Sequence, residues 1–213
     1  VVGGHCNIGS GCRSFIGGGN ENTGNCTNSV IGGGSGNYTC GHHSVVGGGS
    51  GNVASDSGGC STIAGGLNNN ANYTGFIGGG QCNCAQSAFL YATVAGGCCN
   101  SATGGSSFVG GGGCNVAAYC STTVAGGCCN CSNANFSTIA GGCGNYASSC
   151  VSTIVGGKEN NAAGGCSFIG SGYALSACNT FDVVVGGCKN ESCTDGTHGN
   201  YAFMGGGRDN CVK

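Results

Sequence analysis

The chain has 213 residues, including 51 Gly and 21 Cys, and it contains neither Pro nor Trp. Only 6% of the residues are charged, with 5 Lys plus Arg against 7 Asp plus Glu. Collagen is excluded because it needs Pro and a Gly at every third position, and the charge balance excludes a nucleic-acid partner. Apolar runs end long before the ~20 residues of a transmembrane helix, so we expect no membrane span.

A repeat runs through the whole chain, and we number it from the apolar residue that begins each Gly-rich segment, here position 0. Nine of the thirteen spacings between these residues equal 15, and thirteen of the fourteen residues are β-branched. β-Branched side chains favour inward-facing strand positions. In chain order, we expect short strands at Val1, Ile16, Ile31, Val46, Ile63, Ile77, Val94, Val109, Val124, Ile139, Ile154, Ile169, Val184 and Met204.

Position +6 is Asn in every repeat but one, where Leu175 stands instead. A column of stacked Asn residues can pair each side-chain amide with its neighbours, and Asn tolerates the left-handed backbone of tight turns. We therefore predict an Asn ladder at a turn. Its members are Asn7, Asn22, Asn37, Asn52, Asn69, Asn83, Asn100, Asn115, Asn130, Asn145, Asn160, Asn190 and Asn210.

These columns predict an all-β fold, a β-solenoid of about 14 coils of ~15 residues that forms a single domain over 1–213. Coils 46–62 and 77–93 have 17 residues, and coil 184–203 has 20. A helical alternative fails because each Gly pair would cost a helix about 2 kcal/mol relative to Ala.

Positions −1 and +1 share the face opposite to position 0, and they vary together. Phe at −1 always accompanies Gly at +1, whereas Thr accompanies Ala in four repeats, which is volume compensation on a packed surface. We predict that this uncharged face packs against other chains; the alternative is that the rings only cover the outside of the coils. The predicted assembly face contains Phe15, Phe76, Phe108, Phe168 and Phe203.

The segment Ser61-Thr62-Ile63-Ala64-Gly65-Gly66, followed by Asn69 and Ala71, resembles the head repeats of trimeric autotransporter adhesins, the YadA-like family. The Gly-Gly-Gly-x-x-Asn arrays are also similar to those in fibre-like proteins of phages and large viruses. This resemblance implies a left-handed parallel β-roll, a trimer, and a place on a cell or virion surface. The chain departs from that family in its many cysteines and in the Gly that replaces a second inward aliphatic residue.

Cysteine makes up about a tenth of the residues, a density typical of disulfide frameworks in oxidising compartments. Equivalent positions of stacked coils lie ~4.8 Å apart, within disulfide range, so we predict a disulfide ladder. The candidate pairs are Cys12 with Cys26, Cys99 with Cys114, Cys128 with Cys143, Cys150 with Cys166, and Cys178 with Cys193. Metal binding through Cys82-Asn83-Cys84, or through the cluster from Cys128 to Cys131, is the alternative. Because the cysteine count is odd, at least one thiol is free or bonded to another chain.

The rare ionisable residues do not assemble into a recognisable catalytic arrangement. No Ser–His–Asp or Cys–His pattern and no phosphate-binding loop is present, so we expect neither catalysis nor a cofactor. Charges concentrate in the insertion coil, at Lys189, Glu191, Asp195 and His198. Such an insertion is either a recognition loop or a solvated loop fixed by Cys193.

Three functions remain open at this point. The first is a structural protein of an extracellular or virion-surface fibre or adhesin that associates with itself, as a trimer or an end-to-end filament. Its chain is expected to be a processed product or part of a longer protein, because Val1 begins within a strand. The second is an ice-binding solenoid, which should carry an unbroken Thr column, although Phe and Val interrupt position −1 here. The third is a viral fibre domain that binds a surface glycan through the 184–203 insertion.

Overall fold

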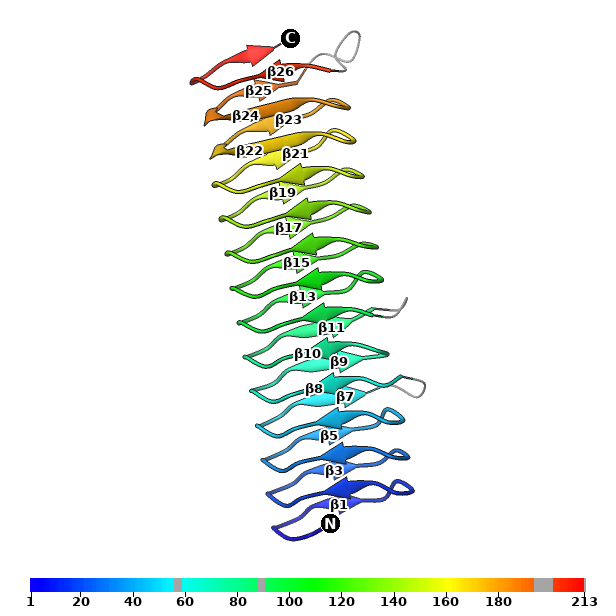
Figure 1. Cartoon of the computed structure of the whole chain (residues 1–213). Coiled ribbons are helices and arrows are strands. Elements are labelled where there is room, and N and C mark those ends of the chain that lie inside the picture. The colour runs from blue at the N-terminus through cyan, green and yellow to red at the C-terminus, as the bar shows by residue number, and fades with distance from the viewer. Residues whose placement is uncertain (56–58, 88–90, 194–200, 213) are drawn as a thin grey trace. The chain divides into compact units, whose positions relative to one another are not determined.

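The computed structural model describes residues 1–55, 59–87, 91–193 and 201–212. The coils group into two compact units, unit 1 (Val1–Ser106) and unit 2 (Ser107–Lys213), and the single domain over 1–213 stays a prediction. Each unit is a stack of β-coils whose successive turns pair in parallel (Figure 1). The predicted all-β solenoid fold is confirmed. None of the described residues forms a helix long and apolar enough to cross a membrane.

In unit 1, every coil contributes one strand to each of two sheets, which we call the even and odd sheets after the strand numbers. The even sheet contains β2 (Phe15–Ile16), β4 (Val30–Ile31), β6 (Val45–Val46), β8 (Thr62–Ile63), β10 (Phe76–Ile77) and β12 (Thr93–Val94). The odd sheet contains β1 (Ile8–Gly9), β3 (Thr23–Gly24), β5 (Tyr38–Thr39), β7 (Val53–Ser55), β9 (Asn70–Asn72), β11 (Cys84–Gln86) and β13 (Ser101–Ala102).

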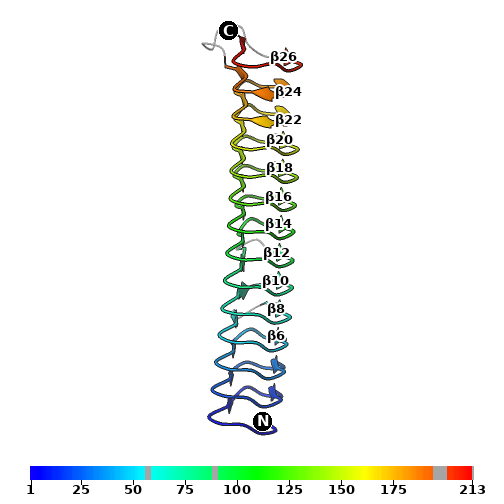
Figure 2. The same cartoon turned by 90° about the vertical axis from the view of Figure 1, so that its left-hand side faces the viewer.

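Unit 2 repeats this arrangement, and the edge-on view separates the two sheets within it (Figure 2). Its even sheet contains β14 (Phe108–Val109), β16 (Thr123–Val124), β18 (Thr138–Ile139), β20 (Thr153–Ile154), β22 (Phe168–Tyr173), β24 (Val183–Cys188) and β26 (Phe203–Met204). Its odd sheet contains β15 (Val116–Ala117), β17 (Cys131–Ser132), β19 (Tyr146–Ala147), β21 (Asn161–Ala162), β23 (Ser176–Ala177), β25 (Glu191–Ser192) and β27 (Cys211–Val212).

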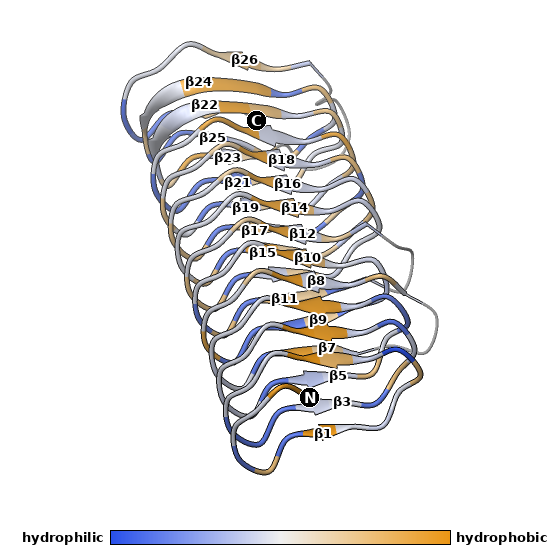
Figure 3. Cartoon of the chain, turned by 60° about the horizontal axis from the view of Figure 1, so that its bottom comes forward, coloured by the Kyte–Doolittle hydropathy of each residue, from blue (hydrophilic) through white to orange (hydrophobic). Residues whose placement is uncertain are grey.

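The core of each unit is a thin layer between the two sheets. Position 0 of the even sheet supplies large side chains such as Ile63 and Ile139, and position +8 of the odd sheet supplies small ones such as Ala71 and Ala147; all four are fully buried. Apolar colour accordingly lies on even strands such as β8 and β10, whereas the odd strands β3 and β5 are pale blue (Figure 3). A large residue facing a small one lets the sheets approach closely while the layer stays filled.

The two corners of a coil differ in how they hold the chain. The first corner, positions +2 to +6, connects the even strand to the odd strand and contains the Asn column. Its position +5 has a positive φ in every coil, with Gly, Asn and Cys among the occupants; examples are Gly144 at 67° and Cys129 at 57°. The second corner follows the odd strand, and the three segments outside the described residues, 56–58, 88–90 and 194–200, all fall there in the sequence.

In two adjacent coils the first corner is part of a strand, and in the first of them Leu175 replaces Asn. Leu175 is fully buried, and its N–H still donates to Oδ1 of Asn160 at 2.9 Å. In this coil β22 lengthens to six residues and pairs with the equally long β24 as far as Tyr173↔Cys188. The coil of β24 keeps Asn190, whose Nδ2 donates to Gly186 at 2.9 Å, so the longer strand also forms where the amide is present.

Candidate functional surfaces

The Asn side chains form a hydrogen-bonded column within each unit, which Leu175 interrupts in unit 2. Asn130 shows the pattern: its Nδ2 donates to the carbonyl oxygens of Gly126 in the same coil (3.0 Å) and Gly142 in the next (2.9 Å). Its Oδ1 accepts the backbone N–H of Asn145 at 3.0 Å and the Nδ2 of Asn145 at 3.1 Å. Every donor and acceptor of this buried amide is therefore used, so the column holds coils together and offers no free group to a ligand.

The same pattern joins the other predicted ladder residues inside their units. In unit 1, Asn37 donates to Gly33 and Gly49 and accepts from Asn52. In unit 2, the N–H and the Nδ2 of Asn210 both donate to Oδ1 of Asn190 at 3.1 Å, across the 20-residue coil. An insertion in the second corner thus leaves the first corner in register.

The predicted assembly-face phenylalanines lie in one outward column of the even sheet in each unit. Phe15 and Phe76 share the column of unit 1, where Val and Thr residues separate them. Phe108, Phe168 and Phe203 share the column of unit 2. All five rings are exposed, by 36% to 71% of their surface.

The covariation of Phe with Gly has a local cause. In three coils the ring lies near position +1 of its own coil, and a Cβ added to Gly110 would lie 3.3 Å from Cε1 of Phe108. The corresponding distance from Gly17 to Phe15 is 3.5 Å. In both coils the carbonyl oxygen of the next coil would be closer still to the added Cβ. The ring is therefore one of two local obstacles to a side chain at position +1, and neither needs a partner chain. The outward exposure of the rings is a separate observation and still needs an explanation.

The even-sheet face is also uncharged over its whole described extent. Positions −1 and +1 carry only Phe, Val, Thr, Ala and Gly from Phe15 to Gly205. The described ion pairs lie instead at the first corner, where Lys158 meets Glu159 at 3.3 Å and Arg208 meets Asp209 at 3.2 Å. The hydrogen bond and charge of Glu159 raise the pKa of Lys158, which remains a cation.

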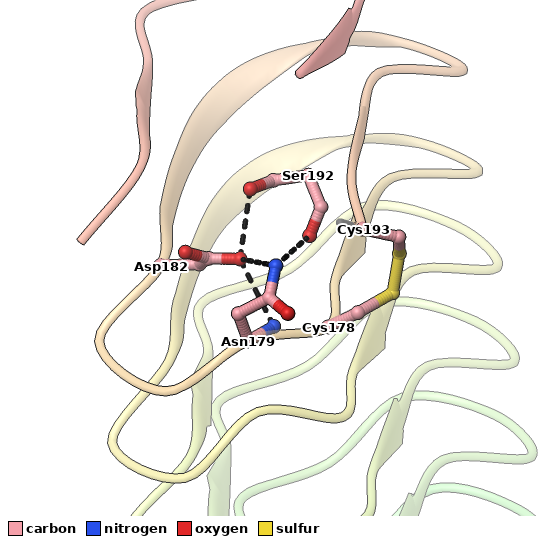
Figure 4. Close-up of a disulfide and its surroundings, with 5 residues drawn as sticks. All are labelled: Cys178, Asn179, Asp182, Ser192 and Cys193. Atoms are coloured by element: carbon pink, nitrogen blue, oxygen red, sulfur yellow. Dashed lines mark hydrogen bonds between the residues drawn. A yellow bond between two sulfur atoms is a disulfide. The ribbon is translucent and has the colours of Figure 1, made fainter. Parts of the chain in front are cut away.

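One predicted disulfide is present among the described residues, between Cys178 and Cys193 of adjacent coils (Figure 4). Their Cα atoms are 4.9 Å apart and their sequence separation is 15. Glu191 lies beside this bridge, and its carboxylate and the two sulfurs lie within 4.8 Å of one another. Sulfurs bonded to each other provide no thiolates, so this cluster is not a metal site in the bridged state.

The remaining candidates are thiols in the structure. Cys12 and Cys26 stand in neighbouring columns, because the residue next to the backbone of Cys26 in the preceding coil is Gly11 and not Cys12. The sulfur of Cys26 lies 3.6 Å from that of Cys40. Burial, followed by the hydrogen bond with Cys40, raises the pKa of Cys26. Cys166 is likewise offset from Cys150, to whose carbonyl oxygen its N–H donates at 2.9 Å. For these two predicted pairs, the structure shows an offset of one column.

Cys128 and Cys143 do share a column, as partners in a parallel bridge. The sulfur of Cys128 also lies 3.4 Å from that of Cys129, its neighbour in the chain. The pKa of Cys129 is raised to about 11, chiefly by the hydrogen bond and negative charge of Cys128. Desolvation and the negative charges of Cys114 and Cys143 act in the same direction. These four cysteines are therefore close enough to influence one another. The fifth predicted pair, Cys99 with Cys114, has one member in each unit.

Asp182 is a buried carboxylate that the sequence reasoning did not identify as structurally important. It occupies position −2, where most coils have Ser, and it is fully buried. Its Oδ2 accepts hydrogen bonds from the N–H (3.0 Å) and Nδ2 (3.1 Å) of Asn179 and from Oγ of Ser192 (2.7 Å). Its Oδ1 accepts the N–H of Ala202 at 3.1 Å, across the insertion coil. The 15-residue spacing from Ser167 was the signal that could have placed it.

The predicted recognition loop lies mostly outside the described residues, including Asp195 and His198. Its described flank, Tyr201, stacks on Phe181 with ring centroids 5.1 Å apart. Phe181, Val151 and Phe136 occupy the same second-corner position of their coils, all exposed and all with positive φ. Their regular spacing in the sequence could have revealed this apolar corner.

Comparison with known proteins adds no further information: no protein-family model and no curated protein matches the chain.

Proposed function

We propose that this chain is a non-enzymatic structural protein, a subunit or segment of an extracellular or virion-surface fibre or adhesin that associates with copies of itself. The single observation that carries the proposal is the outward face of the even sheet. It is uncharged in both units and exposes Phe rings at intervals between Val and Thr residues. Soluble monomers rarely leave so extended an apolar face in contact with water.

A second copy of the chain is the partner that fits this face best. A repeating surface with one chemistry in each coil matches another surface of the same period, because each coil can then make the same contact. No charge has to be buried when two such faces meet, so association carries no desolvation penalty for ionised groups. The outward column of the odd sheet is less uniform, since Asn70, Ser176 and Glu191 stand among apolar residues such as Ile8 and Val53.

The Cys178–Cys193 disulfide and the high cysteine content fit an oxidising compartment. The ladder of fully bonded Asn amides fits a chain whose purpose is mechanical, because it joins each coil to the next without leaving a group for catalysis. Together these features support a load-bearing role outside the reducing cytosol.

The proposal is tested by sedimentation velocity and electron microscopy of the purified protein under non-reducing conditions. Phe108 and Tyr146 form a matched pair, since both side chains are 39% exposed and they project from opposite sheets of unit 2. We expect oligomers or filaments for the unmodified chain and for Tyr146→Lys, and smaller species for Phe108→Lys. A wild-type chain that stays monomeric at high concentration would overturn the proposal. Equal effects of the two substitutions would place the interface elsewhere and would also count against it.

A further inference from the structure

Four exposed thiols lie together at the first corner of unit 2: Cys114, Cys128, Cys129 and Cys143. They occupy positions +4 and +5 of three consecutive coils. Gly113 and Cys128 are partners in one parallel bridge, and Cys128 and Cys143 in the next. The N–H of Cys129 donates to Gly113 at 2.9 Å, which places Cys129 in the same column as Cys114. The corner therefore contains two column pairs, Cys114 with Cys129 and Cys128 with Cys143.

The chain itself shows that column pairs of this kind can bond. Cys178 and Cys193 are column neighbours with a sequence separation of 15, and their Cα atoms lie 4.9 Å apart in the bonded state. Cys114 and Cys129, and Cys128 and Cys143, have the same separation. A distance near 5 Å falls within the range that disulfides occupy.

We propose that this corner is an oxidation site at which Cys114 bonds to Cys129 and Cys128 bonds to Cys143, so that two bridges clamp three successive coils. The oxidant is a low-molecular-weight disulfide. One thiolate of each pair attacks it and releases a small thiol, and the second thiolate displaces the other small thiol from the mixed disulfide. Two S–H bonds are lost and one S–S bond forms for each bridge, while the two protons pass to the two released small thiols.

Alternative pairings satisfy fewer thiols. Cys128 and Cys129 have sulfurs 3.4 Å apart, but Cα atoms of adjacent residues are separated by only about 3.8 Å, below the usual disulfide range. The pairing of Cys99 with Cys114, which the spacing alone also allows, would leave Cys129 with no partner but Cys128. Within unit 1, Cys99 has its own column neighbour in Cys82, because its N–H donates to Gln81 at 2.9 Å. The column pairing uses all four thiols of the corner with each bond between column neighbours, whereas Cys114 with Cys128 and Cys129 with Cys143 would be offset by one column.

The test is peptide mapping by mass spectrometry after the full chain has been equilibrated with a buffer of oxidised and reduced glutathione and then alkylated. Adjacent residues 128 and 129 complicate the assignment, so two double variants isolate each bridge. Cys128→Ser with Cys143→Ser should retain a cross-link between residues 114 and 129. Cys114→Ser with Cys129→Ser should retain one between residues 128 and 143. Cys150→Ser with Cys166→Ser, at the opposite corner, is the control and should retain both bridges.

We expect the wild-type map to contain both column cross-links and none of the four thiols to be alkylated. A cross-link between residues 99 and 114 or between 128 and 129, or a corner that is alkylated at all four positions, would overturn the assignment. The alkylation of the four thiols is read on the unmodified chain, so it still tests the proposal if a double variant fails to fold. The outcome is independent of whether the even-sheet face associates.

Discussion

Asn145 donates from its side-chain nitrogen to the side-chain oxygen of Asn130 at 3.1 Å, and its backbone N–H reaches the same oxygen at 3.0 Å. The side-chain oxygen of Asn130 thus accepts two hydrogen bonds from the next coil, while its Nδ2 donates to the turn carbonyl of Gly126 in its own coil. The column works as a structural element because amides such as that of Asn130 use all their donors and acceptors.

Asn130→Ala is expected to lower the free energy of unfolding by about 3 kcal/mol, because it leaves the carbonyl oxygen of Gly126 and the N–H of the buried Asn145 without these partners. It also removes one of the two hydrogen bonds that the Gly142 carbonyl oxygen accepts. Asn133→Ala is the control from the same coil, since that amide makes an exposed bond to the Tyr146 hydroxyl at 2.9 Å. Urea denaturation measures the free energy of unfolding of both variants. Comparable losses in the two variants would contradict a special role for the column.

Gly127→Ala is expected to destabilise the protein by roughly 2 kcal/mol or more, through strain at positive φ and a steric clash. Its φ is +92°, and a Cβ would meet the carbonyl oxygen of Gly142 in the next coil. At the neighbouring Gly126, an added Cβ would have no atom within 4 Å, and φ is not positive. Gly126→Ala should therefore leave the thermal unfolding midpoint unchanged or slightly raised. A similar fall in the midpoint for both variants would refute this distinction.

Asp182→Asn is expected to cost about 2 kcal/mol in the free energy of unfolding, because one acceptor oxygen becomes an NH₂ group that faces N–H donors. Ser167, at the same position of the preceding coil, has a buried hydroxyl with no partner among the described residues. Ser167→Ala should accordingly be neutral or mildly stabilising. Chemical denaturation of the two variants decides the matter, and a neutral Asp182→Asn would show that the four hydrogen bonds contribute little.

In the fully reduced protein, alkylation of Cys129 should reach half its maximal rate near pH 11, because the thiolate is the reactive form and Cys128 raises the pKa to about 11. Cys128→Ser removes the neighbouring thiol, so the profile of Cys129 should move down towards the ordinary value of 9.0. Mass spectrometry of samples quenched over a pH series measures the rate at this residue. An unchanged profile in Cys128→Ser would show that Cys128 is not the cause.

The repeat alone predicted the solenoid, since a β-branched residue and an Asn recurring at one period leave few other folds. Individual disulfides were harder to predict, because a spacing one residue away from the period moves a cysteine into the next column. Cys12 and Cys26 are fourteen residues apart and Cys150 and Cys166 sixteen, whereas the bonded Cys178 and Cys193 are fifteen. Asp182 was missed because its importance comes from donors contributed by Asn179, Ser192 and Ala202, which only the folded chain brings together.

All the length variation of the repeat falls in the second corner, after strands such as β7, β11 and β25, whereas the first corner keeps the same residue count in every coil. The Asn column explains this difference, because an added residue at the first corner would break two hydrogen bonds in each direction. The solenoid therefore has one edge that is closed to change and one that can accept foreign sequence. A peptide inserted after Ser55 or Gln86 would be displayed without disturbing either sheet, so the fold has the properties of a display scaffold with graft sites along a single edge.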